Sequence, residues 1–249
     1  MEKNKKGLEC FPGDNGLKDL LFRWNYISRK PIYDFFVEKL SGQQGTILDF
    51  GCGKMPYKKI FKCADSYIGL DVESAKEFGF HPDGVIYYDG KDIPLDDESV
   101  DCVVSCQVFE HVPDLNYSMN EIYRVLKKEG TFCFSVPMAQ AIHMDPYDFR
   151  RFTIYGIEQA LNKYNYKNIE IVGTNRPIDS IRWIRALHMR TPFRQLYTTF
   201  SNLCFLNAMK KDKRISVRIE NLVRKLLHKS MRPDEFSRFP IDYLVICKK

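Results

Sequence analysis

Two glycines and two aspartates in the first third of the chain have the spacing of a nucleoside-binding site. Gly51 and Gly53 directly follow a short apolar run, and Asp49 lies just before them. Glycine permits a positive φ angle and lets a ligand approach the backbone closely. Asp71 ends a second candidate strand, 66–70, where a carboxylate can accept hydrogen bonds from both hydroxyls of a ribose. These residues predict a site for a nucleoside-containing cofactor at the carboxyl ends of parallel strands.

The glycine spacing also bears on which cofactor is bound. A dinucleotide fingerprint requires a third glycine where this chain has Pro56, which disfavours a nucleotide-dependent oxidoreductase. The run 49–53, DFGCG, instead resembles motif I of the class I S-adenosylmethionine-dependent methyltransferases, of the type 11 group. In that family the loop passes against the methionine part of the cofactor, and the acidic residue helps to hold its amino group. The resemblance therefore implies cofactor contacts at Asp49, Gly51, Cys52 and Gly53.

The ends of two further candidate strands extend this resemblance. Strand 85–88 leads into Asp89, and strand 100–105 leads into the pair Glu110-His111. The segment 93–113 resembles the corresponding segment of the family, in which an acid after the third strand faces the adenine amine and a Glu-His pair opens the next connection near the methyl-transfer centre. The further cofactor contacts that we expect are Asp71, Val72, Asp89, Gly90, Gln107 and Phe109.

A second polar stretch, 137–153, is expected to bind the acceptor. Its pattern H-x-x-P-Y-D-x-x-R-x-T resembles the segment after the fifth strand in methyltransferases encoded with polysaccharide biosynthesis genes. A hydroxyl acceptor benefits from a base, for which we nominate His143 first and His111 second. The resemblance implies substrate contacts at His111, His143, Tyr147 and Arg150. Asp148 and Arg151 are interpreted as a structural pair at a helix start, with Thr153 as its N-cap.

Hydrophobic periodicity predicts the elements that position these residues. Helices are expected at 17–40, with Pro31 beginning a second helix, and at 57–61, 116–128 and 154–164. Further strands are expected at 131–136, 168–172 and 241–247. The predicted fold is α/β: a Rossmann-like, doubly wound and mostly parallel seven-stranded sheet with the last strand antiparallel, plus a helical insertion.

We expect one methyltransferase domain over 1–249. It divides into an N-terminal helical lid (1–45), a cofactor-binding core (46–172), a basic helical insertion (173–238) and the final strand (239–249). Most of the excess that gives the net charge of +6 lies in the insertion. The insertion is interpreted as a helical cap with a solvated basic face, and the alternative is peripheral docking on an anionic membrane.

Composition limits the compartment and the chemistry. No apolar run has the length of a membrane span, and no apolar segment follows the charged N-terminus. The eight cysteines include no C-x-x-C pair, so we expect reduced thiols, a cytoplasmic protein and no metal site.

The favoured function is S-adenosylmethionine-dependent O-methylation of a saccharide or another small-molecule hydroxyl. One alternative is an RNA or lipid or quinone-precursor methyltransferase, and another is a non-catalytic, methyltransferase-like binding domain. Nucleic acid is disfavoured because the chain lacks an amino-base motif after strand 100–105 and the paired cysteines of cytosine-carbon methylation.

Overall fold

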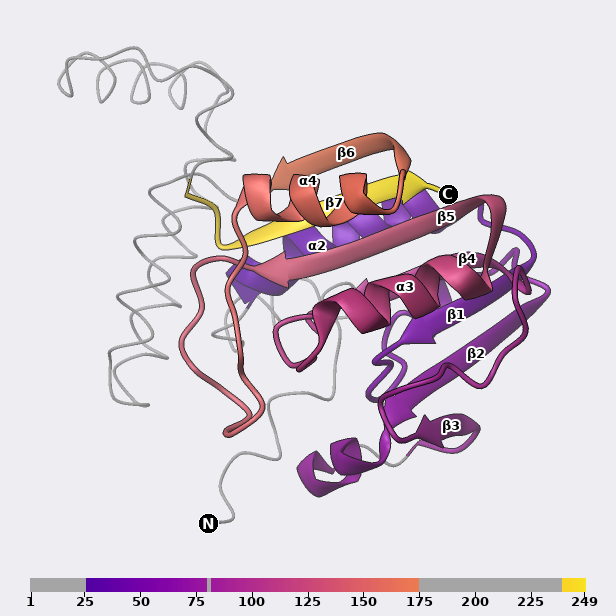
Figure 1. Ribbon diagram of the computed structural model, residues 1–249, viewed down its shortest axis with the longest axis horizontal. Helices are drawn as coiled ribbons and strands as arrows, with labels where there is room; N and C mark the ends of the chain where they lie inside the picture. Colours follow the sequence, from indigo (N-terminus) through magenta and orange to yellow (C-terminus); the bar gives the residue numbers. More distant parts are fainter. Residues whose placement is uncertain (1–25, 80–81, 175–238) are drawn as a thin grey trace, which may run out of the picture.

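The computed structural model describes residues 26–79, 82–174 and 239–249 (Figure 1). One sheet has the strand order β3-β2-β1-β4-β5-β7-β6. Its strands are β1 (Thr46–Phe50), β2 (Ser66–Val72), β3 (Val85–Tyr88), β4 (Val100–Cys106), β5 (Leu126–Pro137), β6 (Lys167–Gly173) and β7 (Asp242–Lys248). Neighbours from β3 to β5 are parallel, whereas β7 is antiparallel to both β5 and β6. The predicted Rossmann-like, mostly parallel sheet with an antiparallel last strand is confirmed.

Helices cover both faces of this sheet (Figure 1). On one face α2 (Tyr26–Leu40) and the 3-10 helix η1 (Lys58–Ile60) pack on alternate strand residues such as Ile47. On the other face α3 (Leu115–Val125) and α4 (Ile154–Lys163) pack on the intervening residues, such as Leu48. Successive side chains of a strand point to opposite faces of the sheet. A buried strand therefore contributes alternate residues to the hydrophobic cores on the two faces.

The two helices on the second face begin beside the carboxyl ends of the parallel strands. The Asp114 side chain accepts a hydrogen bond from the Tyr117 amide and caps α3. Thr153 Oγ1 accepts one from the Gly156 amide at 3.2 Å and caps α4, which confirms the N-cap predicted there. Each cap fixes the point at which a loop from the candidate site enters a helix.

Three predicted helices differ from those observed. The crossover helix expected at 57–61 is observed as the short 3-10 helix η1. The helix expected to reach residue 128 ends at Val125, because Leu126 is fully buried and pairs with Val100 in the sheet. Pro31 lies inside α2 and does not begin a new helix. In these places tertiary packing outweighs local propensity.

Several expectations concern residues outside the described part of the chain. The start of the predicted helix 17–40 and nearly all of the insertion 173–238 belong to them. Among the residues that the structure describes, no helix combines the length and the apolar character required to cross a membrane.

Candidate active site

The glycine loop after β1 is held by backbone hydrogen bonds. Gly51 and Gly53 have positive φ angles of 71° and 52°. The Gly51 amide donates to the Leu70 carbonyl at 2.8 Å, which ties the loop to β2. A Cβ atom on Gly51 would lie 2.4 Å from a methyl carbon of Val108, whereas one on Gly53 would meet no atom within 4 Å. The loop therefore packs against the segment after β4 on one side and borders open space at Gly53.

Asp71 joins the end of β2 to this loop. Its Oδ2 accepts a hydrogen bond from the Gly53 amide and its Oδ1 one from the Val72 amide, both at 2.8 Å. Burial raises the pKa of the Asp71 carboxyl, and these two backbone hydrogen bonds oppose that rise. A carboxylate offers about four acceptor sites, so two sites remain for the hydroxyls of a ribose.

Asp49 and Cys52 lie in the interior beneath the loop. Asp49 is 2% exposed and accepts a hydrogen bond from the Tyr67 hydroxyl. Burial raises the pKa of this carboxyl to about 7. Burial likewise raises the pKa of the Cys52 thiol, which keeps it protonated and does not favour a nucleophilic role.

The ends of β2 and β3 lie side by side. The Val72 side chain is 3.5 Å from the position that a Cβ on Gly90 would take, and Gly90 has a φ angle of 84°. Asp89 is exposed, and its Oδ1 accepts a hydrogen bond from the Lys91 amide at 3.0 Å. Val72, Asp89 and Gly90, all predicted cofactor contacts, therefore lie at neighbouring strand ends.

Of the two predicted cofactor contacts after β4, one lies at the strand end and the other is buried in the core. Gln107 has a φ angle of 55°, and its amide donates to the Ser135 carbonyl at 3.0 Å. Phe109 is 1% exposed and stacks on Phe50 with ring centroids 5.9 Å apart. The Phe109 side chain therefore packs in the core, and contact of Phe109 with the cofactor stays a prediction.

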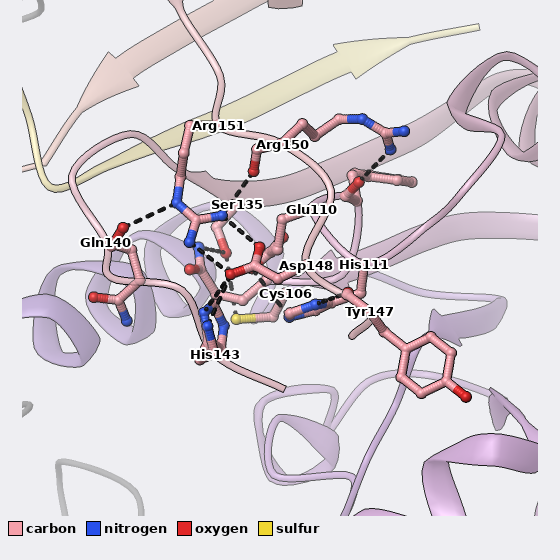
Figure 2. Close-up of polar contacts among 12 residues, drawn as sticks. Cys106, Glu110, His111, Ser135, Gln140, His143, Tyr147, Asp148, Arg150 and Arg151 are labelled. Carbon is pink, nitrogen blue, oxygen red and sulfur yellow. Dashed lines mark hydrogen bonds and ion pairs between the residues drawn. The ribbon is translucent and has the colours of Figure 1, made fainter. Parts of the chain in front are cut away.

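His111 and His143 come together from separate loops, the first after β4 and the second after β5 (Figure 2). Their ring centroids lie 4.7 Å apart in an edge-to-face arrangement. His111 Nδ1 lies 2.6 Å from the Tyr147 carbonyl oxygen, and its Nε2 lies 3.7 Å from Glu110 Oε1. His143 Nδ1 lies 3.1 Å from the Ala141 carbonyl oxygen. The structure thus brings together the two nominated bases.

Two arginines fasten these loops. Arg151 makes two contacts with the Asp148 carboxylate, at 2.5 and 2.7 Å, and the Asp148 side chain is 1% exposed. The pair holds the pKa of Asp148 down at about 2, against the effect of its burial. Arg150 donates to three carbonyls of the turn after β4, those of Phe109, Val112 and Pro113. The predicted Asp148–Arg151 pair is observed, but in the loop before α4 and not at a helix start, whereas substrate binding by Arg150 stays a prediction.

Tyr147 connects the acceptor loop to the cofactor side. Its ring points away from the polar cluster in Figure 2 and meets Phe78 edge-to-face, with centroids 6.2 Å apart. Phe78 ends η2 (Glu73–Phe78), the 3-10 helix that follows β2. The aromatic contact therefore links the loop after β5 to the element next to the expected ribose site.

The sequence analysis named Glu110 only as part of the Glu-His pair and assigned it no role of its own. Its side chain is fully buried, and neither carboxylate oxygen has a hydrogen-bond partner within the described part of the chain. Burial raises its pKa to about 8. The available signal was an acid within an apolar stretch directly before His111, because apolar neighbours at a strand end predict burial.

Comparisons with known proteins agree with this geometry. Residues 48–134 match the family model described as a methyltransferase domain. A curated protein of Mycolicibacterium smegmatis, described as a probable S-adenosylmethionine-dependent methyltransferase, is 31% identical over 111 residues. That match spans 43% of this chain and 42% of the relative, so less than half of the relative's length is represented.

The matched segment, 48–134, is similar to the methyltransferase domain of S-adenosylmethionine-dependent methyltransferases. An S-adenosylmethionine-dependent methyltransferase from Archaeoglobus fulgidus has the same fold, with a TM-score of 0.55 and 17% sequence identity. The superposition covers 93% of this chain and 97% of the other. The 4+2 cyclase SpnF also shares it, with a TM-score of 0.51, 15% identity and coverage of 89% and 80%. Because proteins named for different reactions share this fold, the reaction of this domain must be argued from its site.

Proposed function

We propose that the protein transfers a methyl group from S-adenosylmethionine to a hydroxyl of a saccharide or another small molecule. The observation that carries the proposal is the convergence of three features at the carboxyl ends of the parallel strands. These are the open glycine loop at Gly53, the carboxylate of Asp71 and the paired rings of His111 and His143.

The residues present fit this cofactor. Gly53 leaves space next to a carboxylate that backbone amides hold in place, and Asp89 supplies an exposed acid at the neighbouring strand end. When bound, S-adenosylmethionine supplies a methyl group that its sulfonium makes electrophilic. The remaining tasks of the protein are to align the acceptor, to exclude water and to remove the hydroxyl proton.

His143 is the better placed base of the two histidines. Both ring nitrogens of His111 face protein atoms, the Tyr147 carbonyl and Glu110. His143 directs its Nδ1 toward a carbonyl and the Asp148 carboxylate, and a third of its side chain is exposed. In the neutral ring the proton then lies on Nδ1, so Nε2 carries the lone pair that accepts a proton from the acceptor.

The saccharide acceptor rests on the resemblance of 137–153 to methyltransferases of polysaccharide biosynthesis. The observed loop supports a polar acceptor, because the partly exposed His143 lies there beside His111 (Figure 2). The basic segment 173–238 extends the proposal to a cytoplasmic protein that docks peripherally on an anionic leaflet, where a lipid-linked saccharide would lie. Co-sedimentation with anionic and neutral vesicles tests that docking, and equal recovery with both would contradict it.

The primary test is calorimetric titration with S-adenosylmethionine, S-adenosylhomocysteine and NAD. We expect saturable binding of the first two and none of NAD. Transfer of a radiolabelled methyl group to hydroxyl-bearing saccharides, RNA and phenolic lipids would then identify the acceptor class. Absence of binding by either sulfur compound would overturn the proposal in favour of a non-catalytic domain.

A further inference from the structure

We propose that Glu110, His111 and His143 bind a divalent transition-metal ion beside the acceptor loop. One ligand atom of each residue lies within 4.8 Å of those of the other two. The sequence shows no metal-ligand spacing, because Glu110 and His111 follow β4 whereas His143 belongs to the loop after β5. Only the fold brings the three donors together (Figure 2).

The contacts of the two imidazoles place the proton of each neutral ring on Nδ1, which leaves the Nε2 lone pair available to a metal. A carbonyl oxygen only accepts, so the 2.6 Å contact of His111 Nδ1 with Tyr147 places the proton on Nδ1. The same reasoning applies to His143 Nδ1, which lies 3.1 Å from a carbonyl oxygen and 3.3 Å from Asp148 Oδ2. Metal-binding histidines have this arrangement, in which the other ring nitrogen donates to a carbonyl or carboxylate.

Glu110 supplies the second observation. Both of its oxygens are buried and have no hydrogen-bond partner among the residues that the structure describes. Its Oε1 faces the lone pair of His111 Nε2 at 3.7 Å. Two electron-rich atoms so placed repel each other unless a proton or a cation lies between them, and a buried, unpaired carboxylate is costly.

The donor set selects the class of ion. Two imidazoles and one carboxylate suit zinc, iron, cobalt or manganese, whereas magnesium and calcium prefer oxygen ligands. Metal–ligand bonds of about 2.0–2.2 Å place tetrahedral ligand atoms about 3.4 Å apart. The observed donors lie within 4.8 Å of one another, and the partly exposed His143 lies in a loop that can move to close this gap. Three protein ligands leave coordination positions open for a further oxygen.

The metal site adds a step to the proposed function. It rests on that function only in the assumption that the further oxygen ligand belongs to the acceptor. A hydroxyl of the acceptor bound to the ion would have a lowered pKa and would release its proton to water. In the metal-bound protein this effect would replace direct proton removal by His143. The two mechanisms differ in one residue, because Glu110 is required for the metal site and not for a histidine base.

Calorimetry of the chelator-treated full-length protein with Zn²⁺ tests the site, and Co²⁺ provides a spectroscopic probe. We expect about one high-affinity ion per chain and visible Co²⁺ bands of nitrogen and oxygen ligation. Glu110→Gln keeps the side-chain shape and should weaken binding by about tenfold or more, as should His143→Ala. Cys63→Ser, at an exposed thiol, is the control for adventitious thiolate binding and should bind as the wild type does.

Unchanged Zn²⁺ affinity in Glu110→Gln would overturn the metal site, as would the absence of a saturable ion in the wild type. A proton would then be the group between Glu110 and His111. Titration of the metal-free protein with S-adenosylmethionine separates this outcome from failure of the proposed function. Cofactor binding without metal binding would contradict the metal site and leave the proposed methyl transfer standing. Metal binding without cofactor binding would contradict the proposed methyl transfer and leave the metal site standing.

Discussion

The two halves of the candidate site are held in different ways. On the cofactor side, backbone amides of the glycine loop bond to the Leu70 carbonyl and to the Asp71 carboxylate. On the acceptor side, side chains fix the loops, through Arg150 and the pair of Asp148 with Arg151. The contacts on the cofactor side can form wherever a glycine loop follows one strand and an acid ends the next. Side-chain contacts between loops can be rearranged by changing a few residues, so the acceptor side is suited to diversification.

Substitution of His143 tests the acceptor half most strongly. His143→Ala should lower turnover by about 1,000-fold, because it removes either the base or a metal ligand, and should leave S-adenosylmethionine affinity unchanged. Single-turnover kinetics and calorimetry measure the two quantities. Ile142→Ala, at a neighbouring side chain that is 75% exposed, is the matched control. Parallel loss of turnover and cofactor affinity would contradict the division into two halves.

The two loop glycines test the cofactor half. Gly51→Ala should cost about 3 kcal/mol of unfolding free energy, because the methyl group meets Val108 and the φ angle is positive. Gly53→Ala carries only the conformational cost of about 1 kcal/mol, because the space beside it is open. Urea denaturation measures both. Equal costs would show that Val108 moves away and that the loop is less fixed than inferred.

Asp71 tests whether a backbone-held carboxylate also binds ligand. Asp71→Ala should weaken S-adenosylmethionine binding by about tenfold, the effect of losing hydrogen bonds to a charged group. Calorimetry at a temperature well below unfolding measures it, with Asp65→Ala, a substitution at an exposed aspartate before β2, as the control. Unchanged affinity in the Asp71 variant would argue against the ribose contact.

The buried Asp49 makes the stability of the cofactor half depend on pH. Its pKa of about 7 in the folded protein exceeds the value of about 3.9 in an unfolded chain. The folded state therefore binds the proton more tightly, and this contribution to stability is lost as pH rises through 7. The unfolding free energy of Asp49→Asn, measured relative to that of the wild type, should therefore increase by about 2 kcal/mol from pH 5 to pH 8. Denaturation at both pH values measures this gain, and a constant difference would contradict the assigned cause.

Local pattern predicted the β strands well and the helix limits less well. Strand 85–88 was predicted with its observed bounds, because a short apolar run between turn residues has few other interpretations. The helix after β4 was predicted too long, because Leu126 looks helical in period but is buried in the sheet. The decisive interaction there is a long-range strand pairing, which a local window does not contain.

The sequence by itself determined the glycine loop, the acid at the end of β2, the Glu-His pair and the polar loop after β5. It also indicated the pairing of Asp148 with Arg151, although the pair forms in the loop before α4 and not in a helix. Only the tertiary structure decided that Phe109 belongs to the core and that the buried carboxylate of Glu110, without a hydrogen-bond partner among the described residues, lies close to two histidines. Burial and contact between loops depend on how separate strand ends meet, which is a property of the assembled sheet and not of any single segment.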